Sequence, residues 1–131
     1  MQNLNQIRAR HVLEFAKSTE SASVKGKNGG EVIKKIPPVI MNNGLLAALA
    51  YSMGVKKRDE ETGQDVYPWR NVFDAVAKHL ASKEIGMIPV DRNSAEMLLD
   101  YLSSEDATSV MLRDITAEAG EWLNFARRLV K

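Results

Sequence analysis

The sequence predicts an all-α protein, a compact bundle of about six helices forming a single helical domain over residues 1–131. Apolar residues recur at spacings of three and four, and no stretch alternates apolar and polar residues as a half-buried strand does. The chain has the length of one domain, and its 44% hydrophobic and 27% charged residues are near the averages of globular proteins. This composition excludes a wholly disordered chain.

The first helix is predicted within residues 1–17. Its stripe of Ala9, Val12, Leu13 and Ala16 follows the spacing i, i+3, i+4, i+7. Residues 18–30 are small, polar and rich in glycine, which is typical of a loop. We therefore expect a mobile loop near residues 18–29.

A second helical pattern begins at Glu31 and reaches Ile40, interrupted by Pro37 and Pro38. The prolines lack two backbone donors and bias Ile36 away from the α conformation, which predicts a kink or a break.

Gly44 then marks a helix end with a positive φ. Residues 45–51 are apolar on all sides, so this helix is predicted to be buried at the centre of the fold. Residues 54–67 are charged and aperiodic, which predicts a second mobile loop.

Pro68 suits the start of the next helix, which presents a core stripe. The stripe consists of Trp69, Val72, Phe73, Val76 and Leu80. Asn93 and Glu96 have the form of a capping box for a short helix. The inward residues expected there are Met97, Leu98, Tyr101 and Leu102.

Ser103 and Asp106 are predicted to start the last helix. Its apolar stripe alternates steps of three and four, and we expect it to pack inside the domain rather than against another chain. The stripe consists of Leu112, Ile115, Ala119, Trp122, Ala126 and Leu129.

The net charge of +1 hides an uneven distribution. Residues 1–58 carry ten Lys or Arg and three Glu, whereas residues 59–131 carry eight Lys or Arg and fourteen acids. This asymmetry suggests a region that faces a polyanion and a region for cationic partners, although two solvated faces of an ordinary protein give the same pattern. The absence of cysteine excludes disulfides and a cysteine nucleophile. With no apolar run of membrane-spanning length and no signal peptide visible, we expect a cytoplasmic protein without membrane contact.

Signals for catalysis are weak. His11 and Glu14 share a helix face but lack a third ligand nearby in the sequence, so a solvated pair is favoured over a metal site. Asp74 and His79 are badly spaced for a base and its orienting carboxylate, and His79 is expected on the polar side of its helix. We predict no catalytic residue, no metal and no cofactor.

Basic residues of the first half are the candidates for contacts with a nucleic-acid backbone. Lys34 and Lys35 are predicted on the surface, because Ile33 and Ile36 bury the other side of their helix. Glycines beside the lysines of residues 25–30 attract a phosphate, although a flexible linker with solubilising lysines is the alternative. Aromatic side chains are expected in apolar stripes, so binding should be sequence-blind. The candidate contacts are Arg8, Arg10, Lys25, Lys27, Lys34 and Lys35.

Residues 26–51, from Gly-Lys-Asn-Gly-Gly through Lys-Lys-Ile-Pro-Pro to Asn-Gly-Leu-Leu, resemble the central segment of the small helical subunit of the Cmr effector. Cmr is the type III-B CRISPR complex, which is guided by a CRISPR RNA. Residues 6–9 and 122–128 are similar to the start and the end of that subunit, so the resemblance spans nearly the whole chain.

The resemblance implies a non-catalytic subunit in antiviral defence, of which several copies stack along the backbone subunits. Their basic face lines the channel that receives target RNA, and the large and backbone subunits perform the catalysis. The partners implied are the other Cmr subunits, further copies of the chain and guide or target RNA. Within the matched segments the basic residues are Arg8, Lys27, Lys34 and Lys35, while Arg10 and Lys25 are candidates from charge alone.

Three other interpretations remain open at this point. The first is a free-standing helical nucleic-acid-binding or adaptor protein, for which the prolines leave a poor recognition helix. The second is a small enzyme that uses His11, Glu14 or His79. The third is a structural spacer without RNA contact.

Overall fold

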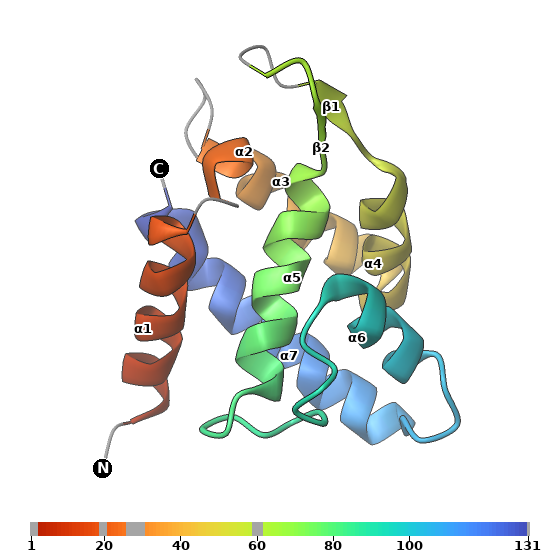
Figure 1. Ribbon diagram of the computed structural model, residues 1–131. Helices are drawn as coiled ribbons and strands as arrows, with labels where there is room; N and C mark the ends of the chain where they lie inside the picture. The colour runs from red at the N-terminus through yellow and green to blue at the C-terminus, as the bar shows by residue number, and fades with distance from the viewer. Residues whose placement is uncertain (1–2, 19–20, 26–30, 59–61, 131) are drawn as a thin grey trace.

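The structure is a computed structural model, which describes residues 3–18, 21–25, 31–58 and 62–130 (Figure 1). It confirms the predicted all-α class, since the sheet in these residues is a single pair of two-residue strands. The helices are α1 (Leu4–Lys17), α2 (Ala22–Lys25), α3 (Glu31–Asn43), α4 (Leu45–Gly54), α5 (Pro68–Ala81), α6 (Ala95–Leu102) and α7 (Ser109–Leu129). The strands are β1 (Lys57–Arg58) and β2 (Asp65–Val66).

Helix α5 is the central element of the bundle. It packs against every other helix of the described residues, with α1 on one side and α4 and α6 on the other (Figure 1). Pro68 occupies its first turn, as predicted. All five residues of the predicted stripe are buried, which gives the core its continuous apolar centre.

Helix α7 crosses behind α5 and contacts α1, α3 and α5. Its stripe therefore packs inside the domain, as predicted, except that Leu129 at the end of the stripe is 38% exposed. Trp122 is fully buried, with its ring centroid 5.8 Å from that of Phe15. The predicted start at Ser103 is wrong. Ser103 ends α6, and Thr108 caps α7 by accepting a hydrogen bond from the Met111 amide at 3.1 Å.

The start of α6 lies one residue beyond the predicted cap. Ser94, not Asn93, accepts the hydrogen bond from the Met97 amide. The carboxylate of Asp74 on α5 accepts a second one from the Ala95 amide at 2.7 Å, so a neighbouring helix helps to set this boundary. Leu98 and Leu102 are buried as predicted, whereas Met97 is 43% exposed and not inward.

Of the kink or break predicted at the two prolines, the break is wrong, because α3 continues as a helix through both. The missing amides of Pro37 and Pro38 remove the α-helical bonds to the carbonyls of Ile33 and Lys34. Packing compensates, since the Ile33 and Ile36 side chains are fully buried and α3 contacts α4, α5 and α7.

Helix α4 folds back on α3 through Gly44, whose φ of 88° confirms the predicted positive value. The prediction of a helix buried on all sides is only half right. Leu45, Ala48 and Leu49 are buried, but one side of α4, which carries Tyr51, is exposed. Helix α4 lies at the edge of the bundle (Figure 1), so this apolar helix keeps a solvent-facing side there.

Both predicted loops contain regular structure. Within residues 18–29, α2 buries Val24 in the core. Within residues 54–67, β1 and β2 pair antiparallel, with Lys57 opposite Val66 and Arg58 opposite Asp65. Strands and a helix this short carry no periodicity that a sequence pattern can detect.

Candidate nucleic-acid interface

Lys34 and Lys35 are exposed on α3 because their neighbours Ile33 and Ile36 occupy the buried side of the helix. Although adjacent helical residues point about 100° apart, both lysines line one groove. The structure thus brings together two of the predicted contacts on a surface that the core does not need.

The groove lies between α3 and α4, reaches the start of α5 and has a volume of about 880 Å³. Its lining combines cationic, aromatic and amide groups with three apolar residues. The lining residues are Lys34, Lys35, Pro38, Val39, Asn43, Ala47, Tyr51 and Trp69. We refer to this hollow as the α3–α4 groove. Such a mixture of charge and aromatic surface is typical of sites that bind single-stranded nucleic acid.

The prediction that aromatic side chains lie in apolar stripes is wrong for Tyr51, which lines the groove together with Lys34 and Lys35. It is 53% exposed, and its ring packs edge-to-face on Trp69 with centroids 4.9 Å apart and an interplanar angle of 77°. Trp69 itself is almost buried. The contact holds the Tyr51 ring in place while much of its surface stays open to the groove. Helix α4 has no polar face from which sequence reasoning could have identified its exposed side.

Arg8 does not join this surface. Its Nε and Nη2 donate to the two carboxylate oxygens of Glu118 at 2.8 and 2.6 Å, and its Nη1 donates to Asn5 at 2.9 Å. Its side chain is only 12% exposed. The hydrogen bonds that Arg8 donates to Glu118 raise the pKa of Arg8 above its ordinary value. The residue therefore holds α1 to α7, and its guanidinium is occupied by protein acceptors.

The other predicted contacts are also separate from the groove. Arg10 on α1 forms an ion pair with Glu84, in the segment after α5. Lys27 lies outside the described residues. Of Lys25 only the backbone, at the end of α2, is described.

A polar cluster, which consists of the buried His79 and Glu118 and the partly buried Arg8 and His11, joins α1, α5 and α7. The prediction that His79 lies on a polar side is wrong, because α1 and α7 cover that side of α5 and His79 is 1% exposed. Its Nε2 is 2.8 Å from a carboxylate oxygen of Glu118, and its Nδ1 is 2.7 Å from Nδ1 of His11.

The contact with Glu118 assigns one ring proton. A carboxylate accepts only, so His79 donates from Nε2 to Glu118. Burial lowers the pKa of His79 and of His11, against the opposing effect of nearby carboxylates. Burial alone would raise the pKa of Glu118, but hydrogen bonds from Arg8 and His79 bring it below its ordinary value.

Glu118 is a residue that sequence reasoning missed, although the sequence carries a signal for it. It stands three residues after Ile115 and four before Trp122, inside the apolar stripe of α7. An acidic residue at such a position requires a buried cationic or hydrogen-bonding partner. The sequence contained no indication that Arg8 is that partner.

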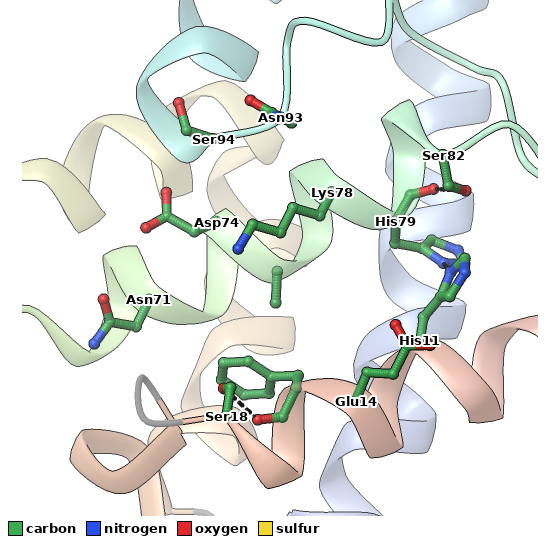
Figure 2. Close-up of a pocket in the computed structure, with 12 residues that line it drawn as sticks. His11, Glu14, Ser18, Asn71, Asp74, Lys78, His79, Ser82, Asn93 and Ser94 are labelled. Carbon is green, nitrogen blue, oxygen red and sulfur yellow. Dashed lines mark hydrogen bonds between the residues drawn. The ribbon is translucent and has the colours of Figure 1, made fainter.

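A second hollow, of about 600 Å³, lies between α1 and α5 and is lined by His11, Glu14, Asp74, Lys78 and His79 (Figure 2). Two of its hydroxyls donate to backbone carbonyls, Ser18 to that of Phe15 and Ser82 to that of His79. The hydroxyl of Ser94 accepts from the Met97 amide. Among the described residues, no group of three or more His, Asp or Glu side chains is arranged to hold a metal ion.

A comparison with protein families decides the class of this protein. The family model for the CRISPR-associated protein Cas_Cmr5 matches residues 4–131. The chain belongs to this family. It is therefore a small subunit of the Cmr, or type III-B, CRISPR-associated complex, as the resemblance indicated. No curated protein and no solved structure matches the chain in the corresponding comparisons.

In this Cmr subunit, α3 and most of α4 lie within residues 26–51. This segment carries the most specific resemblance to the family. The α3–α4 groove is therefore built almost entirely from it. In the described part of the chain, no helix is both long enough and apolar enough to span a lipid bilayer.

Proposed function

We propose that this subunit is a non-catalytic component of the Cmr ribonucleoprotein, which acts in the cytoplasm in antiviral defence. In this proposal its α3 face lines the channel that receives target RNA. Several copies stack along the backbone subunits, so that their α3 faces form a continuous basic surface.

The observation that carries the proposal is the exposure of Lys34 and Lys35 in one groove. Two ammonium groups on a surface that the fold does not require can each neutralise a phosphate. Lysines at these positions read charge rather than sequence, which is what a channel for many different target RNAs requires.

The expected affinity of a single copy is low. Each neutralised phosphate on a single strand contributes about −0.7 to the slope of log K against log salt, so two lysines contribute roughly −1.4. Copies fixed along one strand bind together through a high effective concentration. Weak binding by the isolated chain therefore agrees with the proposal.

The acidic half of the chain is assigned to protein contacts. Exposed acids lie on α6 and on α7, and phosphates would be repelled from them. A neighbouring copy or backbone subunit with a basic surface is a suitable partner for this side. The residues concerned include Glu96, Asp100, Asp114 and Glu121.

The polar cluster supports the non-catalytic assignment. Three of the four ring nitrogens of His11 and His79 lie against each other or against Glu118, and His11 Nε2 is 3.2 Å from a carboxylate oxygen of Glu84. A general base needs a nitrogen that reaches a substrate proton. The histidines of this cluster hold helices together instead.

The test is the target-RNA affinity of the reconstituted, guide-loaded effector, measured over a series of salt concentrations. One preparation contains the wild-type chain, a second contains Lys34→Glu with Lys35→Glu, and a third contains Lys78→Glu with Lys83→Glu. The third is a matched control, because it makes the same change in charge at two exposed lysines outside the α3–α4 groove.

We expect all three chains to be incorporated. The Lys34/Lys35 variant should bind RNA more weakly and with a flatter salt dependence, whereas the control should keep the wild-type slope. Equal affinity of the wild type and the Lys34/Lys35 variant would indicate a structural spacer. Failure of the wild type to enter the complex would indicate a free-standing binding protein.

A further inference from the structure

The α3–α4 groove contains more than the two lysines that the proposed function uses. On α3, Lys35, Val39 and Asn43 follow one another at intervals of four residues and so form one row on the helix. On α4, Ala47 and Tyr51 form a second row. The chain turns back at Gly44, so α3 and α4 run in opposite directions. Lys35, at the start of the α3 row, therefore lies at the same end of the groove as Tyr51, at the end of the α4 row.

The aromatic group at this end is pre-organised. The edge-to-face contact with Trp69 fixes the Tyr51 ring, and Trp69 belongs to the buried core. A ring that is already held loses little side-chain entropy when a ligand stacks on it. An exposed tyrosine on a helix with no such support would not offer this advantage.

We propose that the α3–α4 groove is a subsite for one unpaired RNA nucleotide, with its base stacked on Tyr51 and its phosphate at Lys34 and Lys35. This inference rests on the proposed function and adds a non-ionic contact to it. The base must be unpaired, because a base within a duplex already has both faces stacked on its neighbours. Every base has a π-face, so the subsite accepts all four bases with little preference.

Charge complementarity selects RNA over a protein segment as the occupant. An apolar helix of another subunit would remove the ammonium group of Lys34 from water without supplying an anion, which is unfavourable. A nucleotide provides both an anion for the lysines and a flat ring for the tyrosine. Stacking of one base on an aromatic side chain contributes about 5- to 100-fold in affinity.

The experiment compares reconstituted, guide-loaded effectors that carry Tyr51→Ala, Tyr51→Phe or Met41→Ala. Met41→Ala is the control, since it removes an exposed apolar side chain of α3 outside the groove lining. Target-RNA affinity is measured against salt. In parallel, 2-aminopurine is placed at successive positions of the target strand, because stacking on an aromatic ring quenches its fluorescence.

We expect Tyr51→Ala to weaken binding at least 5-fold with an unchanged salt slope, and to restore fluorescence at positions quenched by the wild type. Tyr51→Phe should retain both affinity and quenching, because the phenyl ring still stacks. The Lys34→Glu, Lys35→Glu variant instead flattens the dependence of affinity on salt. The RNA-lining function and the nucleotide subsite can therefore be refuted independently of each other.

Two results would overturn the subsite. One is unchanged affinity and quenching in an effector that contains Tyr51→Ala, even if the lysine variant is impaired. The other is loss of Tyr51→Ala from the complex although the isolated variant is as helical and as stable as the wild type, which would assign the groove to a protein neighbour.

Discussion

Replacing Glu118 with alanine removes a carboxylate that links three helices. Two of its hydrogen bonds come from Arg8 on α1 and one comes from His79 on α5. The side chains of Arg8 and His79 are 12% and 0% exposed, so little water can replace the lost partner. The variant leaves a buried cation and a buried imidazole N–H without their acceptor.

The expected cost follows from this burial. Removing one partner of a buried ion pair typically costs about 3–5 kcal/mol of unfolding free energy. The whole stability of a domain is about 5–15 kcal/mol, so the variant should lose a large fraction of it. For a chain of this length the melting temperature should fall by roughly 10–20 °C. Glu118→Gln keeps one acceptor oxygen but no charge, and should cost about 1.5–3 kcal/mol.

Denaturant and thermal unfolding, followed by circular dichroism, measure these differences. Glu121→Gln is the matched control, because Glu121 lies one turn along α7 and is 4.0 Å from Arg8 Nη1, but its side chain is 53% exposed. Its loss should change stability by less than about 0.5 kcal/mol. If Glu118→Ala costs no more than this control, the polar cluster does not hold the bundle together and our account of it is wrong.

Three further predictions follow from the same structure. The folded state lowers the pKa values of His79 and Glu118, so the unfolded chain binds more protons than the folded chain in acid. The unfolding free energy should therefore decrease below about pH 6.5 and stay level between pH 7 and 8. An unfolding free energy that is the same at pH 7 and pH 5 would contradict this. Leu49→Asp places a carboxylate at a fully buried position and should abolish the cooperative melting transition; a variant that melts like the wild type would remove α4 from the core. Gly44→Ala places a Cβ on a residue with a φ of 88° and a ψ of 162°, where no neighbouring atom hinders it. Backbone strain alone should therefore lower the unfolding free energy by about 1–3 kcal/mol, as measured by urea unfolding. An unchanged unfolding free energy would mean that the turn relaxes.

Periodicity predicted the helices that are long and have one apolar face. Helix α5 and the stripe of α7 agree with the spacing of three and four because burial and helical geometry act on the same residues. Boundaries were less predictable, since α6 starts where Asp74 of another helix binds the Ala95 amide. The continuous helix through Pro37 and Pro38 likewise depends on tertiary packing that overcomes a local preference.

In the candidate site, too, some residues could be placed from the pattern of one helix, whereas others depend on how the helices pack. Lys34 and Lys35 could be placed on the surface because the isoleucines beside them bury the opposite side of one helix. The exposure of Tyr51 and the burial of His79 could not be predicted, because each depends on which helix covers the next one. Likewise, Arg8 counted as a surface cation until its partner, 110 residues later in the sequence, was known.

The 110 residues between Arg8 and Glu118 have a consequence for the synthesis of the protein on the ribosome. At about 5–20 residues per second, Glu118 is added roughly 5–20 s after Arg8. During this interval α1 exposes the apolar side chains of Ile7, Val12 and Phe15, because α7, one of the helices that covers them, does not yet exist. The apolar side of α1 therefore stays partly uncovered until α7 docks and completes the bundle.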